Sequence, residues 1–430
     1  MALTGRVVLM LLGGLIAVAV SPTMVTVRMW WLVVVLLVAA DLALAVSPKR
    51  LAWQRQPSAP VRLHQEATSV LSVHNTANRP VRGVLRDAWQ PSAGAVRERH
   101  PLRLDAGQRA EVTTALIPTR RGRRDTDQVT VRSYGPLGLA ARQRSIPVPG
   151  SLTVLPPFPS RRHLPRLLAV LRQLDGRSAV RVRGQGTEFD SLRDYVSGDD
   201  VRSIDWRATA RRGAVVVRTW QPERDRHIVI VVDTSRTSAG RVDDTPRLDA
   251  ALDAALLLAT VATRAGDRVD VIVGDRQVRT RVLSAGRGDR LDRLSPALAD
   301  AHPTLVEADW SVLGAEVSRR APRRALVVLL TPLEPAAVEE ALIPVLEGMT
   351  RRHRVIVASV RDPALSAMTH TLDSVPQVHA AAAAEATLRR RERTSAVLQR
   401  MSAMVIDEPP GQLPLALSSA YLNLKGRGAL

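Results

Sequence analysis

Two long apolar runs dominate the beginning of the chain. The first covers residues 7 to 27, with Ser21-Pro22-Thr23 inside it, and the second covers residues 29 to 46. At 1.5 Å rise per residue, each run makes a helix of about 27 to 31 Å, which matches the apolar thickness of a bilayer. Because no polar region or cleavage site separates the runs, we expect a retained transmembrane hairpin within residues 1 to 50 and not a signal peptide.

Basic residues flank this hairpin unevenly. Arg6 precedes the first run, Lys49-Arg50 follows the second, and Arg28 alone occupies the expected turn. By the positive-inside rule, we expect a protein of the cytoplasmic (inner) membrane whose soluble domains face the cytoplasm. Asp41 lies within the second run, and we expect its carboxylate to reach the lipid headgroups at the cytoplasmic end.

Short stretches of alternating apolar and polar residues follow between residues 51 and 155. They include VRLHQEATSVLSVHN, RPVRGVLRDAW and AEVTTALIPT, and turn formers such as TANRP, LDAGQ and SYGPLG separate them. Strands of this length and spacing are typical of an antiparallel sandwich. We therefore expect a β-rich, sandwich-like domain, in which no candidate for chemistry stands out.

Uninterrupted aliphatic runs appear after a proline-rich break, LPPFPSRRHLP. They lie at residues 228 to 232, 269 to 273, 325 to 330 and 355 to 359. Such runs are typical of buried parallel strands, and helix-like stretches beginning near residues 247, 337 and 379 separate or follow them. We expect a linker over residues 156 to 226 and a doubly wound, mostly parallel α/β domain over residues 227 to 430. GDRQ at 274 to 277 predicts a hairpin to one antiparallel edge strand.

Composition narrows the classes of function. The chain has no cysteine, which excludes disulfides, thiolate metal sites and cysteine nucleophiles. Its formal net charge of +20 comes almost entirely from arginine, as expected of a GC-rich coding sequence, and aromatic residues are only 3% of the chain. Because no stretch alternates arginine with stacking aromatics, we do not expect nucleic-acid binding. A basic protein that binds a membrane surface or nucleic acid remains one alternative.

Several common catalytic motifs are absent. Neither lysine lies in a Gly-Lys-Ser or Gly-Lys-Thr sequence, so a P-loop nucleotide site is not expected, and GQG at 184 to 186 lacks the third glycine of a dinucleotide fingerprint. There is also no H-E-x-x-H and no G-x-S-x-G. We accordingly expect neither an enzyme of these classes nor a small-molecule substrate.

The densest polar stretch covers residues 184 to 225. Its carboxylates are Glu188, Asp190, Asp194, Asp199, Asp200 and Asp205, interspersed with Arg193, Arg202, Arg207, Arg211 and Arg212. An internal network of salt bridges accounts for this composition better than paired catalytic acids do, since structural ion pairs imitate active sites. We expect the segment to pack against the α/β domain, with Asp200 or Asp205 paired to arginine and Trp206 at least partly buried.

This stretch and the strand that follows it resemble the signature of the bacterial domain of unknown function 58 family. The positions that carry the resemblance are Arg193, Tyr195, Gly198, Asp199, Asp200, Arg202, Asp205 and Trp206. The resemblance implies a von Willebrand factor type A-like α/β domain behind a two-helix membrane anchor and a β domain. It also implies a protein that acts with a MoxR-type AAA+ ATPase on a client protein.

The sequence DTSRTS, directly after the first aliphatic run of the α/β domain, is the candidate metal site. Type A domains hold a divalent cation through D-x-S-x-S after the first core strand, and Asp233, Ser235 and Thr237 match that motif. A hard cation such as Mg²⁺ or Mn²⁺ prefers these oxygen ligands. The loop that should supply a further aspartate has Thr331-Pro332 instead, with Glu334 nearby, so we expect weak binding. A helix cap is the alternative role for Asp233.

A second loop completes the metal-ion-dependent adhesion site of such domains, and here only Thr304 and Asp309 are candidates. Our favoured interpretation is a non-enzymatic, membrane-anchored scaffold or adaptor that binds protein partners. The alternative from another class is a metal-dependent hydrolase that uses Asp233 with the carboxylates of residues 188 to 205.

Overall fold

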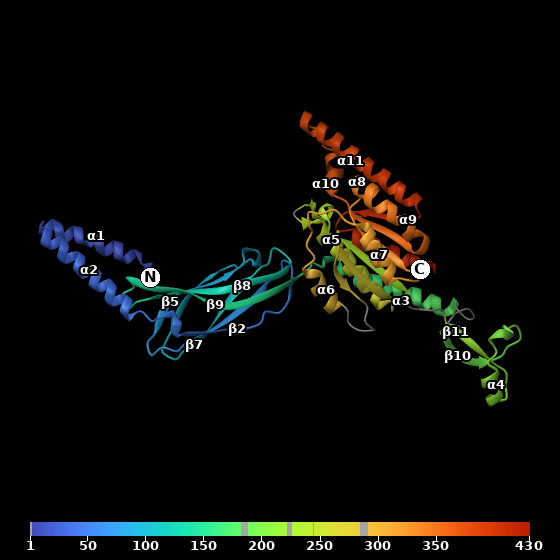
Figure 1. Ribbon diagram of the computed structural model, residues 1–430, viewed down its shortest axis with the longest axis horizontal. Coiled ribbons are helices and arrows are strands. Elements are labelled where there is room, and N and C mark those ends of the chain that lie inside the picture. The colour runs from blue at the N-terminus through green and yellow to red at the C-terminus, as the bar shows by residue number, and fades with distance from the viewer. Residues whose placement is uncertain (1, 182–187, 222–225, 244, 284–290) are drawn as a thin grey trace. The chain divides into compact units, whose positions relative to one another are not determined.

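The computed structural model describes residues 2–181, 188–221, 226–243, 245–283 and 291–430 (Figure 1). The chain divides into two compact units, Met1–Leu155 and Pro156–Leu430, which are described separately below. The division falls at the proline-rich break.

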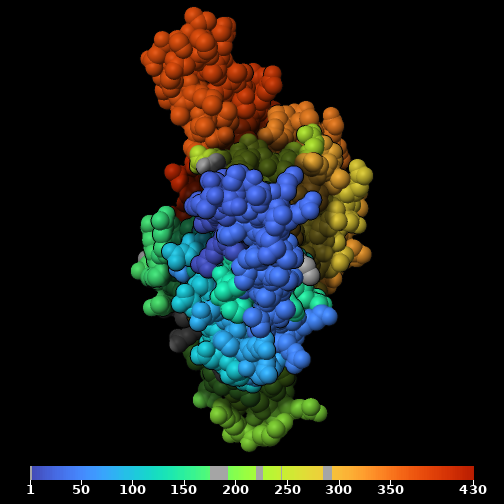
Figure 2. All heavy atoms as spheres, turned by 90° about the vertical axis from the view of Figure 1, so that its left-hand side faces the viewer, coloured from blue at the N-terminus to red at the C-terminus, as the bar shows by residue number. Residues whose placement is uncertain are grey.

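A helical hairpin begins the first unit. It consists of α1 (Gly5–Val20) and α2 (Met24–Leu44), and its uncovered surface faces the viewer, in blue, in Figure 2. Among the described residues, one helix, within Met24–Arg50, is long and apolar enough to cross a membrane, and α1 is shorter, at 16 residues.

The turn of this hairpin lies earlier than expected. Arg28 is inside α2, so the helix bounds of 7 to 27 and 29 to 46 are wrong. The reason is local, because Pro22 cannot continue a helix hydrogen-bond ladder and Thr23 caps α2 by accepting a bond from the Thr26 N–H.

Asp41 is fully buried near the end of α2, which contradicts the expected contact with headgroups. Its carboxylate accepts hydrogen bonds from the backbone N–H groups of Leu137 (2.7 Å), Leu139 (2.7 Å) and Ala140 (2.8 Å). A Cβ on Gly135 would lie 2.2 Å from Asp41 Oδ1, so only glycine permits this approach. The turn after β8 thus supplies the hydrogen-bond donors that offset the free-energy cost of burying this carboxylate.

Two β-sheets form the rest of the first unit. In the described residues the larger has the strand order β1-β9-β8-β5-β6, with β3 beside β9, and the smaller has the order β2-β4-β7. The strands are β1 (Ala2–Leu3), β2 (Leu51–Arg55), β3 (Val61–Arg62), β4 (Ala67–Asn75), β5 (Val81–Trp89), β6 (Arg99–Leu104), β7 (Arg109–Leu116), β8 (Gly122–Tyr134) and β9 (Ala140–Leu155). Leu71 and Val73 from one sheet share a core with Leu85 and Val131 from the other, as in a sandwich.

The second unit is built on a mostly parallel sheet. Its strand order in the described residues is β16-β15-β12-β17-β18-β19, and only β16 pairs antiparallel, at the edge. The strands are β12 (His227–Asp233), β15 (Arg268–Gly274), β16 (Val278–Val282), β17 (Leu326–Leu330), β18 (Arg354–Val360) and β19 (Met404–Glu408). The expected strands and the antiparallel edge hairpin are confirmed, whereas the sequence did not indicate β19.

Helices cover both faces of this sheet. The longer ones are α3 (Leu164–Arg181), α5 (Arg247–Arg264), α6 (Leu291–Ala299), α7 (Trp310–Arg320), α9 (Ile343–Arg352), α11 (Val375–Arg400) and α12 (Leu413–Gly426). Ile228 and Ile230 of β12 pack into one core with α3, α5 and α12, and Val229 and Val231 pack into the opposite core with α7 and α9. Both faces of the strand are buried, which explains its uninterrupted aliphatic sequence.

Part of the expected linker belongs to this core. Leu167 and Leu171 of α3 pack in the same cluster as Leu252 of α5, so the α/β domain begins well before residue 227. The remaining elements of the second unit are β10 (Glu188–Asp194), α4 (Trp206–Arg212), β11 (Val216–Gln221), β13 (Arg241–Val242), β14 (Thr245–Pro246), α8 (Pro335–Ala337) and α10 (Pro363–Met368). β10 and β11 form an antiparallel hairpin that carries the family signature.

Candidate functional site

The aspartate and hydroxyl cluster lies at the carboxyl ends of two adjacent parallel strands. Asp233 is the last residue of β12, and Thr331 follows the last residue of β17. The register pairs Val232 with Leu330, which brings Asp233 and Thr331 side by side. Ligands bind at this edge in open α/β sheets. The candidate metal site at Asp233 therefore lies where this fold favours a binding site.

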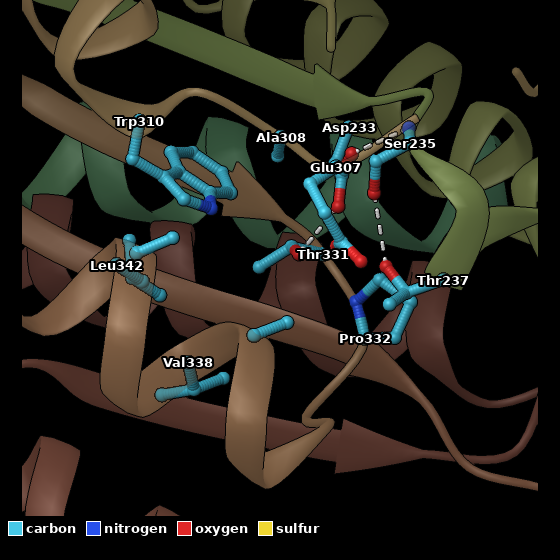
Figure 3. A pocket seen from close by; sticks show the side chains of 12 residues that line it. Asp233, Ser235, Thr237, Glu307, Ala308, Trp310, Thr331, Pro332, Val338 and Leu342 are labelled. Atoms are coloured by element: carbon cyan, nitrogen blue, oxygen red, sulfur yellow. Dashed lines mark hydrogen bonds between the residues drawn. The ribbon is translucent and has the colours of Figure 1, made fainter. Parts of the chain in front are cut away.

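Asp233 is held at two points by hydrogen bonds (Figure 3). Its Oδ1 accepts from the N–H of Ser235 and its Oδ2 accepts from the hydroxyl of Thr331, both at 2.7 Å. The hydroxyls of Ser235 and Thr237 lie 3.0 Å apart, so they form a second oxygen pair beside the carboxylate. The D-x-S-x-T side chains therefore converge, as the sequence predicted.

A small cavity of about 10 Å³ opens beside these oxygens, which is room for roughly one water-sized sphere. Its lining comprises Asp233, Ser235, Thr237, Glu307, Ala308, Trp310, Thr331, Pro332, Ala337, Val338, Ala341 and Leu342. Oxygen atoms gather on one side and Trp310, Val338 and Leu342 on the other (Figure 3).

Burial sets the electrostatics of the cluster. It raises the pKa of Asp233, an effect that the hydrogen bonds from Ser235 and Thr331 reduce and that the neighbouring charge of Asp275 increases. Burial also acts on Asp275, but the hydrogen bonds from Arg279, Thr304 and the Gln277 N–H outweigh it and lower the pKa of that carboxyl. Of these two carboxylates, Asp233 is therefore the one without a compensating positive charge among the residues that the structure describes.

These residues offer the oxygen ligands that a hard divalent cation prefers, but only one of them, Asp233, carries a negative charge. Asp233, Ser235 and Thr237 offer oxygen atoms at a cavity of suitable size, and a cation there would offset the cost of the buried charge. Within the described residues, no group of three or more His, Cys, Asp or Glu side chains is arranged to hold a metal. Any cation at this site would depend on neutral hydroxyl ligands, which favours weak binding.

The other residues considered for the metal site lie elsewhere. Glu334 pairs with Arg247 at 3.1 Å and does not line the cavity. Thr304 donates to Asp275 at 2.8 Å, and Asp309 caps α7 by accepting from the N–H groups of Ser311 and Val312. Neither second-loop candidate reaches Asp233, because each satisfies a backbone or carboxylate partner of its own.

The helix-cap alternative for Asp233 is also not what the structure shows. A short 3-10 turn, Arg236–Ala239, follows Asp233, and the next α-helix, α5, begins only at Arg247. The carboxylate therefore accepts hydrogen bonds from a tight turn and from the neighbouring strand end, and not from an α-helix amino terminus.

Glu307 and Trp310 line the cavity, and the sequence analysis missed both. They flank the start of α7, and the carboxylate of Glu307 forms an ion pair with Arg236 beside the cluster. The signal that could have found them is Asp309-Trp310-Ser311, an N-cap followed by a helix, since it places the preceding residues in a loop at the sheet edge.

The signature carboxylates serve the local fold of the β10–β11 hairpin. Asp199 pairs with Arg193 at 2.5 Å, and that bond lowers the pKa of Asp199. Asp205 caps α4 and pairs with Arg218 at 2.8 Å; the N–H of Ala208 makes the largest contribution to lowering its pKa. The expected pairing of Asp205 with arginine is confirmed.

The remaining signature positions follow from the same hairpin. Asp200 accepts a hydrogen bond from the Arg202 N–H, and Gly198 has a φ of +108°, which disfavours other residues. Trp206 is 68% exposed, so most of the side chain that was expected to be at least partly buried is open to solvent, because the short helix α4 leaves its first residue uncovered. The side chains of Glu188 and Asp190 lie outside the described residues.

The fold and site define a mixed α/β protein with a buried aspartate and hydroxyl cluster at the carboxyl edge of a mostly parallel sheet. Residues 191–394 match the family model described as "Protein of unknown function DUF58". The matched part of the chain, residues 191–394, belongs to this family.

Several proteins are similar to parts of this chain. Uncharacterised proteins of Mycobacterium tuberculosis and Mycobacterium bovis are 27% identical over 218 residues, which are 46% of this chain and 66% of theirs. The conserved hypothetical protein BatB from Bacteroides thetaiotaomicron is 11% identical with a TM-score of 0.29, over 46% of this chain and 98% of BatB. A PapD-like domain of human CEP192 has a TM-score of 0.20 and 12% identity, over 26% of this chain and 92% of that domain.

Proposed function

We propose that the protein is a membrane-anchored scaffold whose α/β domain, of von Willebrand factor type A-like character, binds protein partners at the Asp233 edge of its sheet. The observation that carries this proposal is the buried, uncompensated Asp233 carboxylate next to the hydroxyl pair of Ser235 and Thr237. A site of this kind is suited to recognition through a shared cation.

In this proposal Mg²⁺ or Mn²⁺ is held by Asp233, Ser235 and Thr237, with Thr331 keeping the carboxylate in place. A bound cation would leave room in its coordination shell for a carboxylate of the partner protein. The apolar wall formed by Trp310, Val338 and Leu342 excludes water from one side of the cluster, which strengthens such a contact.

The hydrolase alternative lacks support in the geometry. Of the carboxylates in residues 188 to 205, Asp199, Asp200 and Asp205 serve turns, caps and ion pairs within the β10–β11 hairpin, and Asp194 is exposed to solvent. The cavity has one further carboxylate among its described lining residues, Glu307, and Arg236 neutralises it. A catalytic pair needs a second carboxylate that is free to exchange a proton.

Membrane anchorage through α2, cytoplasmic orientation of the soluble part and partnership with a MoxR-type AAA+ ATPase complete the proposal. The length and apolar composition of α2 support the first, the charge bias around the hairpin supports the second, and family resemblance supports the third. A reporter that is active only outside the membrane should give no signal when fused to the C-terminus.

Affinity purification from the native membrane tests the binding site. The tagged wild-type chain should retain an ATPase or client protein in Mg²⁺ and release it in a chelator, and Asp233→Ala should not retain it. Glu334→Gln is the matched control, because Glu334 is a nearby carboxylate outside the cavity. Equal retention of the partner by Asp233→Ala would overturn the assignment of this edge as the binding surface.

A further inference from the structure

The connection between β10 and β11, residues 195–215, exposes large apolar side chains that no part of the proposed function uses. Val196 is 61% exposed, Val201 is 64% exposed and Trp206 is 68% exposed. Leaving a tryptophan this open to water is costly, so such a patch marks an interaction surface. We call residues 195–215 the signature loop.

Arginines with no carboxylate partner among the described residues lie between and beside these apolar residues along the signature loop. Asp199 neutralises Arg193, and Asp205 neutralises Arg218. Within the described part of the chain, the arginines of the loop without a carboxylate partner are Arg202, Arg207, Arg211 and Arg212. Asp194 is exposed and Asp200 is committed to a backbone N–H, so the free positive charges outnumber the free negative ones.

The orientation of α4 directs part of this charge outward. The hydroxyl of Thr209 accepts a hydrogen bond from the Val216 N–H, which turns that face of α4 toward β11. With 100° between successive residues, Arg207 and Arg211 lie on the opposite face, one turn apart. Trp206 begins the same helix nearer to the Thr209 side, directly before Arg207 in the sequence, and its side chain is exposed.

We propose that the signature loop docks onto the anionic lipid surface of the membrane that anchors the chain. An exposed indole inserts readily at the level of the headgroups, and arginines around it attract anionic lipids. The proposal rests on membrane anchorage by α2, which would tether the chain to a bilayer. An acidic protein surface is the competing occupant, and the test separates the two.

The absence of cysteine makes a site-specific test direct. Ser197→Cys adds one thiol in the exposed part of the loop, where an environment-sensitive fluorophore can be attached. The full chain is reconstituted in nanodiscs of phosphatidylcholine alone or with phosphatidylglycerol, some carrying a nitroxide-labelled lipid. We expect quenching by the nitroxide lipid at least threefold stronger in the anionic discs, and reduced by high salt.

Two variants examine the residues themselves. Trp206→Ser combined with Arg207→Ser and Arg211→Ser should abolish the quenching, whereas Arg390→Ser with Arg393→Ser, at exposed arginines of α11, should leave it unchanged. Circular dichroism of each variant checks the fold. If the loop variant is folded and quenching persists, or if the fluorophore responds only when a soluble protein fraction is added, the lipid proposal is overturned.

A second label separates this inference from the anchorage on which it rests. Leu36→Cys lies near the middle of α2, where the side chain is 59% exposed and faces lipid if the helix spans the bilayer. Quenching at residue 36 without quenching at residue 197 refutes loop docking and leaves the anchor intact. A label at residue 36 that stays in water in every disc refutes the anchor itself.

Discussion

The hydroxyl of Thr331 donates a 2.7 Å hydrogen bond to Oδ2 of Asp233 across two neighbouring strand ends. A neutral donor thus occupies the position where the resemblance to type A domains implies an acidic ligand. The bond stabilises the charged form of Asp233 but adds no negative charge for a cation, which makes the site dependent on a single carboxylate.

Cation binding should therefore be weak but measurable. A ligand that binds only the folded state stabilises it by about 2.7 kcal/mol at a hundredfold excess over Kd. We expect no shift of the melting temperature of the full-length protein in micromolar Mg²⁺ or Mn²⁺, and a clear upward shift in the millimolar range. Asp233→Ala should abolish the shift, and a shift that survives this substitution would place the cation elsewhere.

Replacing Thr331 with aspartate should tighten the site. Two adjacent buried carboxylates repel each other, so Thr331→Asp should melt at a lower temperature than the wild type in a chelator. In Mg²⁺ the difference in melting temperature between the variant and the wild type should become smaller or change sign, because the new carboxylate is a charged ligand for the cation. Differential scanning fluorimetry across a cation titration measures both effects; an unchanged midpoint for cation binding would show that residue 331 does not approach the ion.

The raised pKa of Asp233 predicts a particular pH dependence. In the absence of cations, the folded state accepts a proton on Asp233 at a higher pH than the unfolded state, whose carboxyl has the ordinary value of 3.8. The energetic cost of the buried charge is therefore full at neutral pH and disappears as the pH falls through the folded pKa toward 3.8.

Asp233→Asn isolates this contribution, since it removes the charge and keeps the shape. The β12 amides should exchange hydrogen more slowly in the variant than in the wild type at pH 7, and the difference in opening free energy should shrink toward pH 4. A difference that is constant across this range, after correction for intrinsic exchange, would mean that Asp233 does not titrate with a raised pKa.

The sequence predicted the sheet and the convergence of Asp233, Ser235 and Thr237, because both are consequences of local pattern. Strands buried on two faces are uninterrupted aliphatic runs, and residues that follow such a strand lie at its carboxyl edge. Glu307 was not predictable in this way. It belongs to a loop between separate helices, and only the packing of α7 on the sheet brings it to the cavity.

The expectations for Asp41 and Trp206 were wrong for a different reason, because each followed a general rule that the local surroundings override. A charge near the end of a membrane helix usually reaches the headgroups, yet three backbone donors more than 90 residues away hold Asp41. A tryptophan in a polar segment usually marks a core contact, yet Trp206 begins a helix of seven residues, none of which is buried. Neither arrangement has a signature in the nearby sequence.

Asp205→Ala should act on the signature loop and not on the whole protein. The substitution removes the cap of α4 and the ion pair with Arg218, so the loop loses the contacts that fold it. Hydrogen exchange should accelerate across residues 195–215 while the main melting transition, which reports the α/β core, stays unchanged. A large fall in that melting temperature would show that the loop contributes to the core.

Removing the Asp41 carboxylate should release the turn after β8. Asp41→Ala leaves three backbone N–H groups without an acceptor, and each buried one costs about 1–3 kcal/mol. Limited proteolysis of the detergent-solubilised protein should then cut within residues 135–140. Asp87→Asn is a useful comparison, since it weakens a buried ion pair of the β-sheets with Arg55 and should not expose that turn.

The hydrogen bonds between Asp41 and this turn also couple the orientation of the β-sheets to the thickness of the membrane. In a chain anchored by α2, the three hydrogen bonds tie the end of the helix to the turn before β9 and to the first residue of that strand. A helix tilts when its apolar length exceeds the thickness of the bilayer. A change of tilt would therefore turn the β-sheets of the first unit together with the helix.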